Sequence, residues 1–353
     1  MRSIWQRLFG SGAVAATRTR QYPATPVRAR VAATTSPTGD APTTCPTASP
    51  EEIEDRFHRF VFGFPHSDVH PPSGVELATL NRLEPLSTRF DMRSLPRLPA
   101  VLPQLFRMLK SDRSSGGEVA KLVGRDPLMV GEVMRATSSA YYRTAQPIAS
   151  LQQAVILMGQ EGLHRVLTQH VMKPILQASG AAAGRGATGE RLWDHAERCS
   201  HGCAWFAKNA GGGDVFEAYL AGIICQTGTV AVVRLLDQLV PSTPKVVSSA
   251  FVAGCARLAA RLSVQAATYW ELPPAVISAL AERHNAARQP VSSPLGKALL
   301  SANLLAMAQV LGEHELISSE LDFDEGWPGS YPPSQLSRCQ LDMRNNFLPD
   351  EDA

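Results

Sequence analysis

The spacing of apolar residues along most of the chain is helical. From residue 95 onward they recur every three or four positions, as at Val119 and Leu122, and hardly any stretch alternates with the period of two that a β-strand requires. Helix-start residues accompany this pattern. Asp126 stands directly before Pro127, where an accepting side chain and a proline suit the first turn of a helix. We therefore predict an all-α fold.

A segment rich in glycine and alanine, residues 180–189, interrupts the helical pattern, and its composition predicts a flexible connector. We expect two packed helical subdomains around it, over residues 94–178 and 190–312. The second subdomain should contain several long helices, because periodic segments occur at residues 192–210, 246–270, 275–284 and 295–311.

The two ends of the chain lack this pattern. Residues 1–50 contain six arginines and no acidic residue before Asp40, in a background of Ala, Thr, Pro and Ser, which predicts a disordered tail. Residues 51–93 should form a short helix, over residues 51–62, followed by a linker. The periodicity fades again near the C-terminus, so we expect residues 313–353 to be a loose tail.

The composition is that of a folded globular protein, with 44% hydrophobic and 19% charged residues. Thirty-four basic and 32 acidic residues leave a net charge of +2, too small to make the whole surface attractive to nucleic acid or anionic lipid. The sequence contains no run of about 18 apolar residues, so we expect no membrane-spanning helix. The six cysteines form no C-x-x-C pair and follow no secretion signal, which favours reduced thiols in a cytoplasmic protein.

Two groups of side chains are candidates for chemistry. His195, Cys199, His201 and Cys203 lie close in sequence, and a spacing of four places three of them on one helical face. A tetrahedral zinc site usually draws ligands from a second element, which is not evident nearby, so buried thiols beside a hydrogen-bonded histidine are favoured. Cys225 could be a nucleophile, but the sequence supplies no activating base, which favours a packing role.

Several motifs together identify a family resemblance. They are R-D-P at 125–127, S-A-Y-Y at 139–142, P-I-A-S at 147–150, L-W-D-H-A at 192–196 and Y-W-E-L-P-P at 269–274. Their order and spacing resemble the HDOD domain, the HD-related output domain of bacterial signalling proteins, over residues 94–312. The resemblance implies an all-α fold whose second part is similar to the HD superfamily.

Members of the HD superfamily bind divalent metals through histidines and aspartates and hydrolyse phosphate esters. The resemblance aligns five positions of this chain with ligands of that site: His195, Cys225, Gln226, His284 and Asn303. Cys225 and Gln226 replace the paired His-Asp, and Asn303 replaces the last aspartate. A hard ion that activates water needs anionic oxygen ligands, and amides are poor substitutes. We therefore expect a degenerate site with no metal or other cofactor and no catalysis.

The resemblance implies a non-catalytic regulatory module that binds other signalling proteins, such as receiver, diguanylate cyclase or histidine kinase proteins, in motility, stress or virulence control. The groove between the two helical parts is the expected partner surface. One alternative is a metal-dependent HD-type phosphohydrolase acting on nucleotides or cyclic dinucleotides. Another is membrane or nucleic-acid binding through the arginine-rich tail, although we expect neither nucleic acid nor an integral membrane segment.

Overall fold

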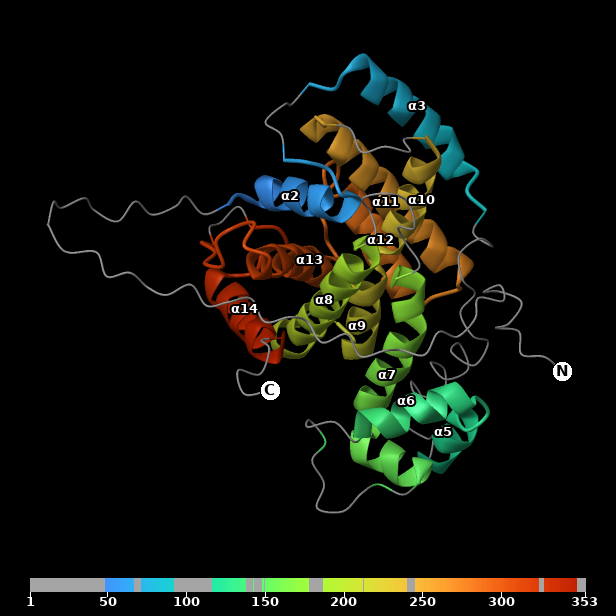
Figure 1. Ribbon diagram of the computed structural model, residues 1–353. Coiled ribbons are helices and arrows are strands. Elements are labelled where there is room, and N and C mark those ends of the chain that lie inside the picture. Colours follow the sequence, from blue (N-terminus) through green and yellow to red (C-terminus); the bar gives the residue numbers. More distant parts are fainter. Residues whose placement is uncertain are drawn as a thin grey trace, which may run out of the picture. The chain divides into compact units, whose positions relative to one another are not determined.

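The computed structural model describes a set of ranges within one compact unit, Cys45–Ala353. These ranges are residues 48–66, 71–91, 116–137, 142, 148, 150–177, 187–211, 213–239, 245–323 and 327–347. Regular secondary structure in them is helical throughout, which confirms the predicted all-α fold (Figure 1). Of the tail expected over residues 1–50, residues 1–47 lie outside the described residues.

In the described residues, the N-terminal part contains three helices: α5 (Gly116–Val123), α6 (Pro127–Thr137) and α7 (Leu151–Gln177). The start of α6 is the one that the sequence predicts, because Asp126 Oδ1 accepts a hydrogen bond from the Leu128 amide at 2.9 Å. Gly159 breaks α7 with a φ of 64°, a left-handed conformation that favours glycine. The part of α7 after this break continues to the HD-like part and packs against α8.

Six helices form the HD-like part. In chain order they are α8 (Thr188–Ala210), α9 (Val215–Ile224), α10 (Thr227–Leu239), α11 (Ser249–Tyr269), α12 (Pro274–Asn285) and α13 (Pro294–Glu313). Helix α8 packs mainly against α9 and α13. It approaches α9 so closely that a Cβ at Gly222 would lie 2.5 Å from the Ser200 Cα atom.

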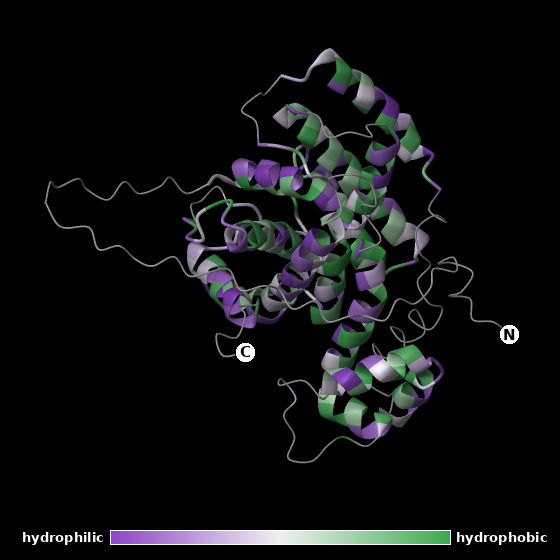
Figure 2. Ribbon diagram, viewed as in Figure 1, coloured by the Kyte–Doolittle hydropathy of each residue, from purple (hydrophilic) through white to green (hydrophobic). Residues whose placement is uncertain are grey.

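The central helices of this part are strongly apolar (Figure 2). Residues 215–239 and 294–313 are long and apolar enough to cross a membrane by composition alone. However, 94% and 78% of the respective apolar windows are buried inside the fold. This burial is what core helices show, so their hydropathy is explained by packing against neighbouring helices.

Three further helices of the described residues belong to neither of these two parts. Helix α2 (Pro50–Phe62) matches the short helix expected from the sequence. The linker expected after it contains α3 (Gly74–Thr88), which a capping box begins: the Glu76 amide donates to Ser73 Oγ, and the Ser73 amide donates to Glu76 Oε2. Helix α3 packs on α10 and α11.

The loose tail expected over residues 313–353 does not hold for α14 (Pro333–Phe347), which packs on α8. Leu336, Cys339 and Met343 recur on one face of α14 and are fully buried. Pro333 stands at the first position of α14, where its missing N–H costs nothing. This proline therefore marks the start of a helix as well as a break in the helical pattern before it.

Candidate functional site

The structure brings four of the five aligned positions together in the interior. We call His195, Cys225, Gln226 and Asn303 the buried centre; their side chains are between 0% and 2% exposed. His195 lies on α8 and Asn303 on α13, whereas Cys225 and Gln226 form the junction between α9 and α10. These positions therefore lie together where three segments distant in sequence meet.

Hydrogen bonds within the buried centre hold its two amides. Gln226 Nε2 donates to Asn303 Oδ1 at 3.5 Å, and Gln226 Oε1 accepts from the Thr229 hydroxyl at 2.7 Å. Asn303 Nδ2 points to the Met307 sulfur at 3.8 Å. Each amide thus has a partner, as a buried polar group requires.

Neighbouring helices fix the backbone of the α9–α10 junction. The Cys225 carbonyl accepts from Ser263 Oγ on α11 at 2.9 Å and from Arg283 Nη1 on α12 at 3.1 Å. Ser263 Oγ also accepts from the Gly228 amide at 2.9 Å. These bonds satisfy backbone groups left over at the junction of two helices. The junction is consequently positioned by side chains from two other helices.

The buried centre is electrically neutral at physiological pH. Burial, together with the positive charge of Arg283, lowers the pKa of His195 to about 3. Burial raises the pKa values of the Cys199 and Cys225 thiols well above their ordinary range. His195 Nε2 faces the Asn303 carbonyl at 3.4 Å, while Nδ1 has no hydrogen-bond partner among the described residues. The Phe57 ring packs on the imidazole, with centroids 4.8 Å apart.

The residues present do not fit the hard, water-activating ion of the HD superfamily. Ligand atoms of His195, Cys199 and Cys225 lie within 4.8 Å of one another, but the described part of the chain adds no carboxylate to this group. Imidazole and thiol are soft donors and suit a zinc-like ion better than magnesium or manganese. All three side chains are at most 1% exposed, so a phosphate ester in solution has no access to them.

This grouping differs from the one that sequence spacing indicates. Cys199 faces Cys225 on another element, with the two sulfurs 3.7 Å apart. His201 instead bonds to Asp342 on α14, with Nε2 and Oδ2 2.6 Å apart. The second element that a zinc site would need is thus the α9–α10 junction, which proximity along the chain could not show.

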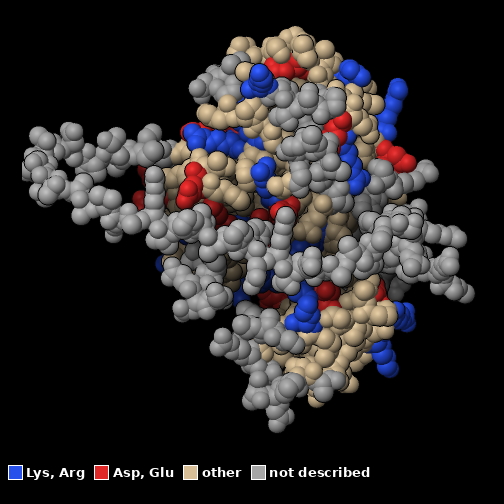
Figure 3. Space-filling model, viewed as in Figure 1, with Lys and Arg blue, Asp and Glu red and all other residues tan. Residues whose placement is uncertain are grey.

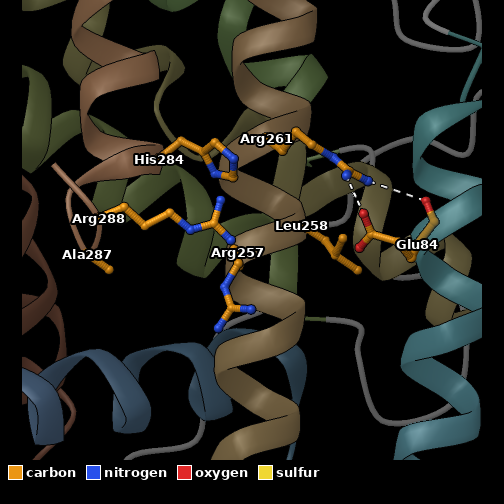
Figure 4. Close-up of a pocket in the computed structure, with 7 residues that line it drawn as sticks. All are labelled: Glu84, Arg257, Leu258, Arg261, His284, Ala287 and Arg288. Carbon is orange, nitrogen blue, oxygen red and sulfur yellow. Dashed lines mark hydrogen bonds and ion pairs between the residues drawn. The ribbon is translucent and has the colours of Figure 1, made fainter.

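His284, the fifth aligned position, lies elsewhere. It lines a pocket of about 260 Å³ together with Glu84 of α3, Arg257 and Arg261 of α11, and Arg288 (Figure 4). We call this the arginine pocket. Burial lowers the pKa of His284, and the surrounding arginines lower it further. This cluster was not expected from the sequence, although the spacing of four from Arg257 to Arg261 indicates a cationic helix face.

A larger groove of about 570 Å³ lies between the N-terminal and HD-like parts. We call it the α7–α8 groove; its charged lining residues are Glu132, Arg135, Arg165, His170, Lys173 and Glu197. Gln169 Nε2 on α7 donates to Glu197 Oε1 on α8 at 3.2 Å, which links the two walls. Charges of both signs are also interspersed among uncharged residues on the face shown in Figure 3.

Known proteins resemble this chain in sequence and in fold. An uncharacterised protein of Treponema pallidum (strain Nichols) is 20% identical over 246 residues, which are 66% of this chain and 46% of that protein. This chain therefore spans less than half of that relative's length.

Three solved structures share the fold. An HDOD domain protein of unknown function from Geobacter sulfurreducens is 17% identical, with a TM-score of 0.51 over 77% of this chain and 99% of that one. A candidate metal-dependent phosphohydrolase from Shewanella amazonensis SB2B is 15% identical, with a TM-score of 0.50 over 77% and 100%. A candidate signal transduction protein from Marinobacter aquaeolei VT8 is 16% identical, with a TM-score of 0.51 over 84% and 64%.

The match of the sequence to a family model assigns the chain to a family most directly. The family model of the HDOD domain matches residues 95–286, which is more than half of the chain. This match and the shared helical fold confirm the resemblance seen in the sequence motifs. The chain belongs to the HDOD domain family.

Proposed function

We propose that this protein is a non-catalytic signal-transduction module that acts by binding other signalling proteins in the cytoplasm of a bacterium. The observation that carries this proposal is the amide pair of the buried centre. Gln226 and Asn303 stand at positions that the family resemblance aligns with metal-binding aspartates, and they bond to each other at 3.5 Å.

The energetics of burial support the loss of metal chemistry. A carboxylate at 2% exposure without a metal ion would carry a desolvation penalty of several kcal/mol. An amide with hydrogen-bond partners avoids most of this cost, because it has no net charge to desolvate. The packed, neutral interior is thus stable without an ion and offers no anionic oxygen to hold one.

The state of the cysteines supports the cytoplasmic location. Cys199, Cys203, Cys225, Cys255 and Cys339 are all buried and carry no disulfide among the described residues. The Cys199 and Cys225 sulfurs are 3.7 Å apart and remain unbonded. Free thiols in a protein core are typical of a reducing compartment.

The α7–α8 groove is the partner surface in this proposal. Its walls come from both helical parts, and its lining combines basic, acidic and apolar side chains. Lys173 lies over the Trp193 ring at 5.3 Å from the ring centroid, so the groove also presents an aromatic surface beside a cation. Such a lining suits a polar protein segment, because aromatic and charged groups there can anchor both its apolar and its charged side chains.

A pull-down with the tagged full-length chain tests this function. We expect the wild type to retain the same signalling proteins in repeated preparations, and the variant Arg165→Glu with Lys173→Glu, which reverses charge in the groove, to lose them. Arg125→Glu with Lys245→Glu is the matched control, since both residues are exposed and neither lines the groove. Specific retention of no protein across several growth conditions, or equal retention by the groove variant, would contradict the proposal.

The alternative of a metal-dependent phosphohydrolase predicts a different result. It requires that the wild type hold manganese, iron or zinc tightly and show hydrolytic activity, and that His195→Ala lose both the metal and the activity. Metal analysis and an activity assay on the same preparation separate the two functions, because a soft ion held without turnover has a structural role only.

A further inference from the structure

Four nitrogen-bearing side chains converge on the arginine pocket from α11, α12 and the turn after α12. Arg257 and Arg261 are one helical turn apart on α11, His284 lies in the last turn of α12, and Arg288 lies in the turn that follows this helix. Figure 4 shows the side chains of Arg257, Arg288 and His284 close together, while Arg261 reaches toward Glu84. Glu84 is the only carboxylate among the described residues that line this pocket.

The positive charge of the pocket is only partly compensated. Arginine stays protonated at physiological pH, so three guanidinium groups and one carboxylate leave a formal charge of about +2. Arg261 bonds to Glu84 and to the Ser87 hydroxyl. Arg257 and Arg288 are exposed, and their guanidinium groups have no hydrogen-bond or ion-pair partner among the described residues. Their donors are therefore available to a ligand.

His284 adds a further polar group without a partner. Its Nδ1 atom is buried and makes no hydrogen bond within the described part of the chain. An imidazole ring carries at least one N–H donor in either protonation state, so His284 can donate a hydrogen bond to an anion in this pocket. An anion would relieve the repulsion among the guanidinium groups and would accept hydrogen bonds from them.

We propose that the arginine pocket binds a small ligand through a phosphate or diphosphate group. Guanidinium groups bind phosphate oxygens in a bidentate manner, and several that converge select for high negative charge. The volume of about 260 Å³ suits a phosphorylated small molecule rather than a folded partner. The non-polar lining is Leu258 and Ala287, and the described lining residues include no Phe, Tyr or Trp to stack on a base. Recognition is therefore of the phosphate end.

Glu84 is a competitor for this anion. Its carboxylate occupies Arg261, but the side chain is 57% exposed, and an ion pair in contact with water contributes little to stability. A phosphate group can therefore take over a donor of Arg261 at small cost. Removal of the Glu84 charge should strengthen anion binding, a change that general damage to the fold would not produce.

The arginine pocket shares no residue with the buried centre or with the α7–α8 groove. The proposal thus goes beyond the proposed regulatory function and does not depend on it. Loss of partner binding in the groove variant and loss of anion binding in a pocket variant would be separate results.

Isothermal titration of the full-length protein with inorganic pyrophosphate tests the proposal, with inorganic phosphate and sulfate as further probes at the same ionic strength. We expect one saturable pyrophosphate site per chain, bound more tightly than sulfate. Arg257→Gln with Arg288→Gln should weaken binding about tenfold or more, because two charge-assisted contacts are lost. Glu84→Gln should strengthen it by about threefold, since a competing charge of modest energy is removed.

Arg125→Gln with Arg338→Gln is the matched control, because it removes the same charge at exposed positions outside the pocket. This control should bind pyrophosphate as the wild type does, and circular dichroism should show that all variants are folded. Absence of saturable binding, equal affinity for sulfate, or an equal loss in the control variant would overturn the proposal. Unchanged binding in the double pocket variant would overturn it as well.

Discussion

The two histidines that the family resemblance aligns with metal ligands lie in opposite environments. His195 is fully buried, packs on Phe57 and belongs to a neutral cluster of amides and thiols. His284 is half-buried at the edge of α12, beside three arginines and an open pocket. A shared motif therefore does not imply a shared site. The interior groups amides, thiols and an imidazole with no carboxylate in the described cluster, while His284 belongs to a surface that carries unbalanced positive charge.

The largest expected effect comes from a charge placed in the interior. Asn303→Asp should lower the free energy of unfolding at neutral pH by about 3 kcal/mol or more, because the new carboxylate is buried and no cationic group bonds to the Asn303 side chain among the described residues. Burial raises the pKa of such a group, so the folded state holds a proton that the unfolded state loses. The loss should therefore shrink as pH falls toward 4, the ordinary range of aspartate.

Urea unfolding at several pH values measures this loss. Asn345→Asp is the control, because Asn345 is exposed on α14, and it should cost less than about 1 kcal/mol. An Asn303→Asp variant as stable as the wild type would contradict the expected cost of burying the charge. Strong stabilisation of the variant by manganese would show that the buried centre accommodates a metal ion.

Truncation of each histidine compares the two regions directly. His195→Ala should cost about 2 kcal/mol or more, since it leaves a cavity against the Phe57 ring. His284→Ala should cost less than about 1 kcal/mol, because the side chain is partly exposed and its Nδ1 atom makes no hydrogen bond within the described part of the chain. Equal losses in urea unfolding would contradict the distinction between a packed interior and an open pocket.

A pH titration of stability separates the buried imidazole from the rest of the chain. His195 has a pKa of about 3 when folded and an ordinary value of 6.5, so below pH 6.5 the unfolded state takes up a proton that the folded state does not. The wild type should therefore lose stability relative to His195→Gln as pH falls from 6.5 toward 3. The maximal slope is about 1.4 kcal/mol per pH unit. A parallel pH dependence of the two proteins would show that His195 is not held neutral.

The smallest effect is expected at the surface ion pair. Glu84→Gln should change the free energy of unfolding by less than about 1 kcal/mol, and the change should diminish as salt is added. Arg261 keeps its bond to the Ser87 hydroxyl in this variant. Thermal unfolding at low and high ionic strength measures it, and a large, salt-independent loss would assign Glu84 a structural role instead.

The sequence predicted the core helices and the grouping given by family motifs, but not the contacts between helices. Helical periodicity indicated the core helices, and the family motifs indicated that His195, Gln226 and Asn303 belong together. Helical periodicity does not show which residues of different helices lie close together. The Cys199 and Cys225 sulfurs, which are 3.7 Å apart, are an example. The same limit applies to His284, because the packing of α12 on α11 decides which residues it meets. The C-terminal helix was missed since prolines precede its short apolar face.

One measurement tests the central claim most directly: phosphodiester hydrolysis by the purified full-length protein, with a cyclic dinucleotide and bis(p-nitrophenyl) phosphate as substrates. The account predicts no turnover above the uncatalysed rate, whether manganese is added or a chelator is present, and no difference between the wild type and His195→Ala. Turnover that a chelator abolishes, manganese restores and His195→Ala removes would contradict it.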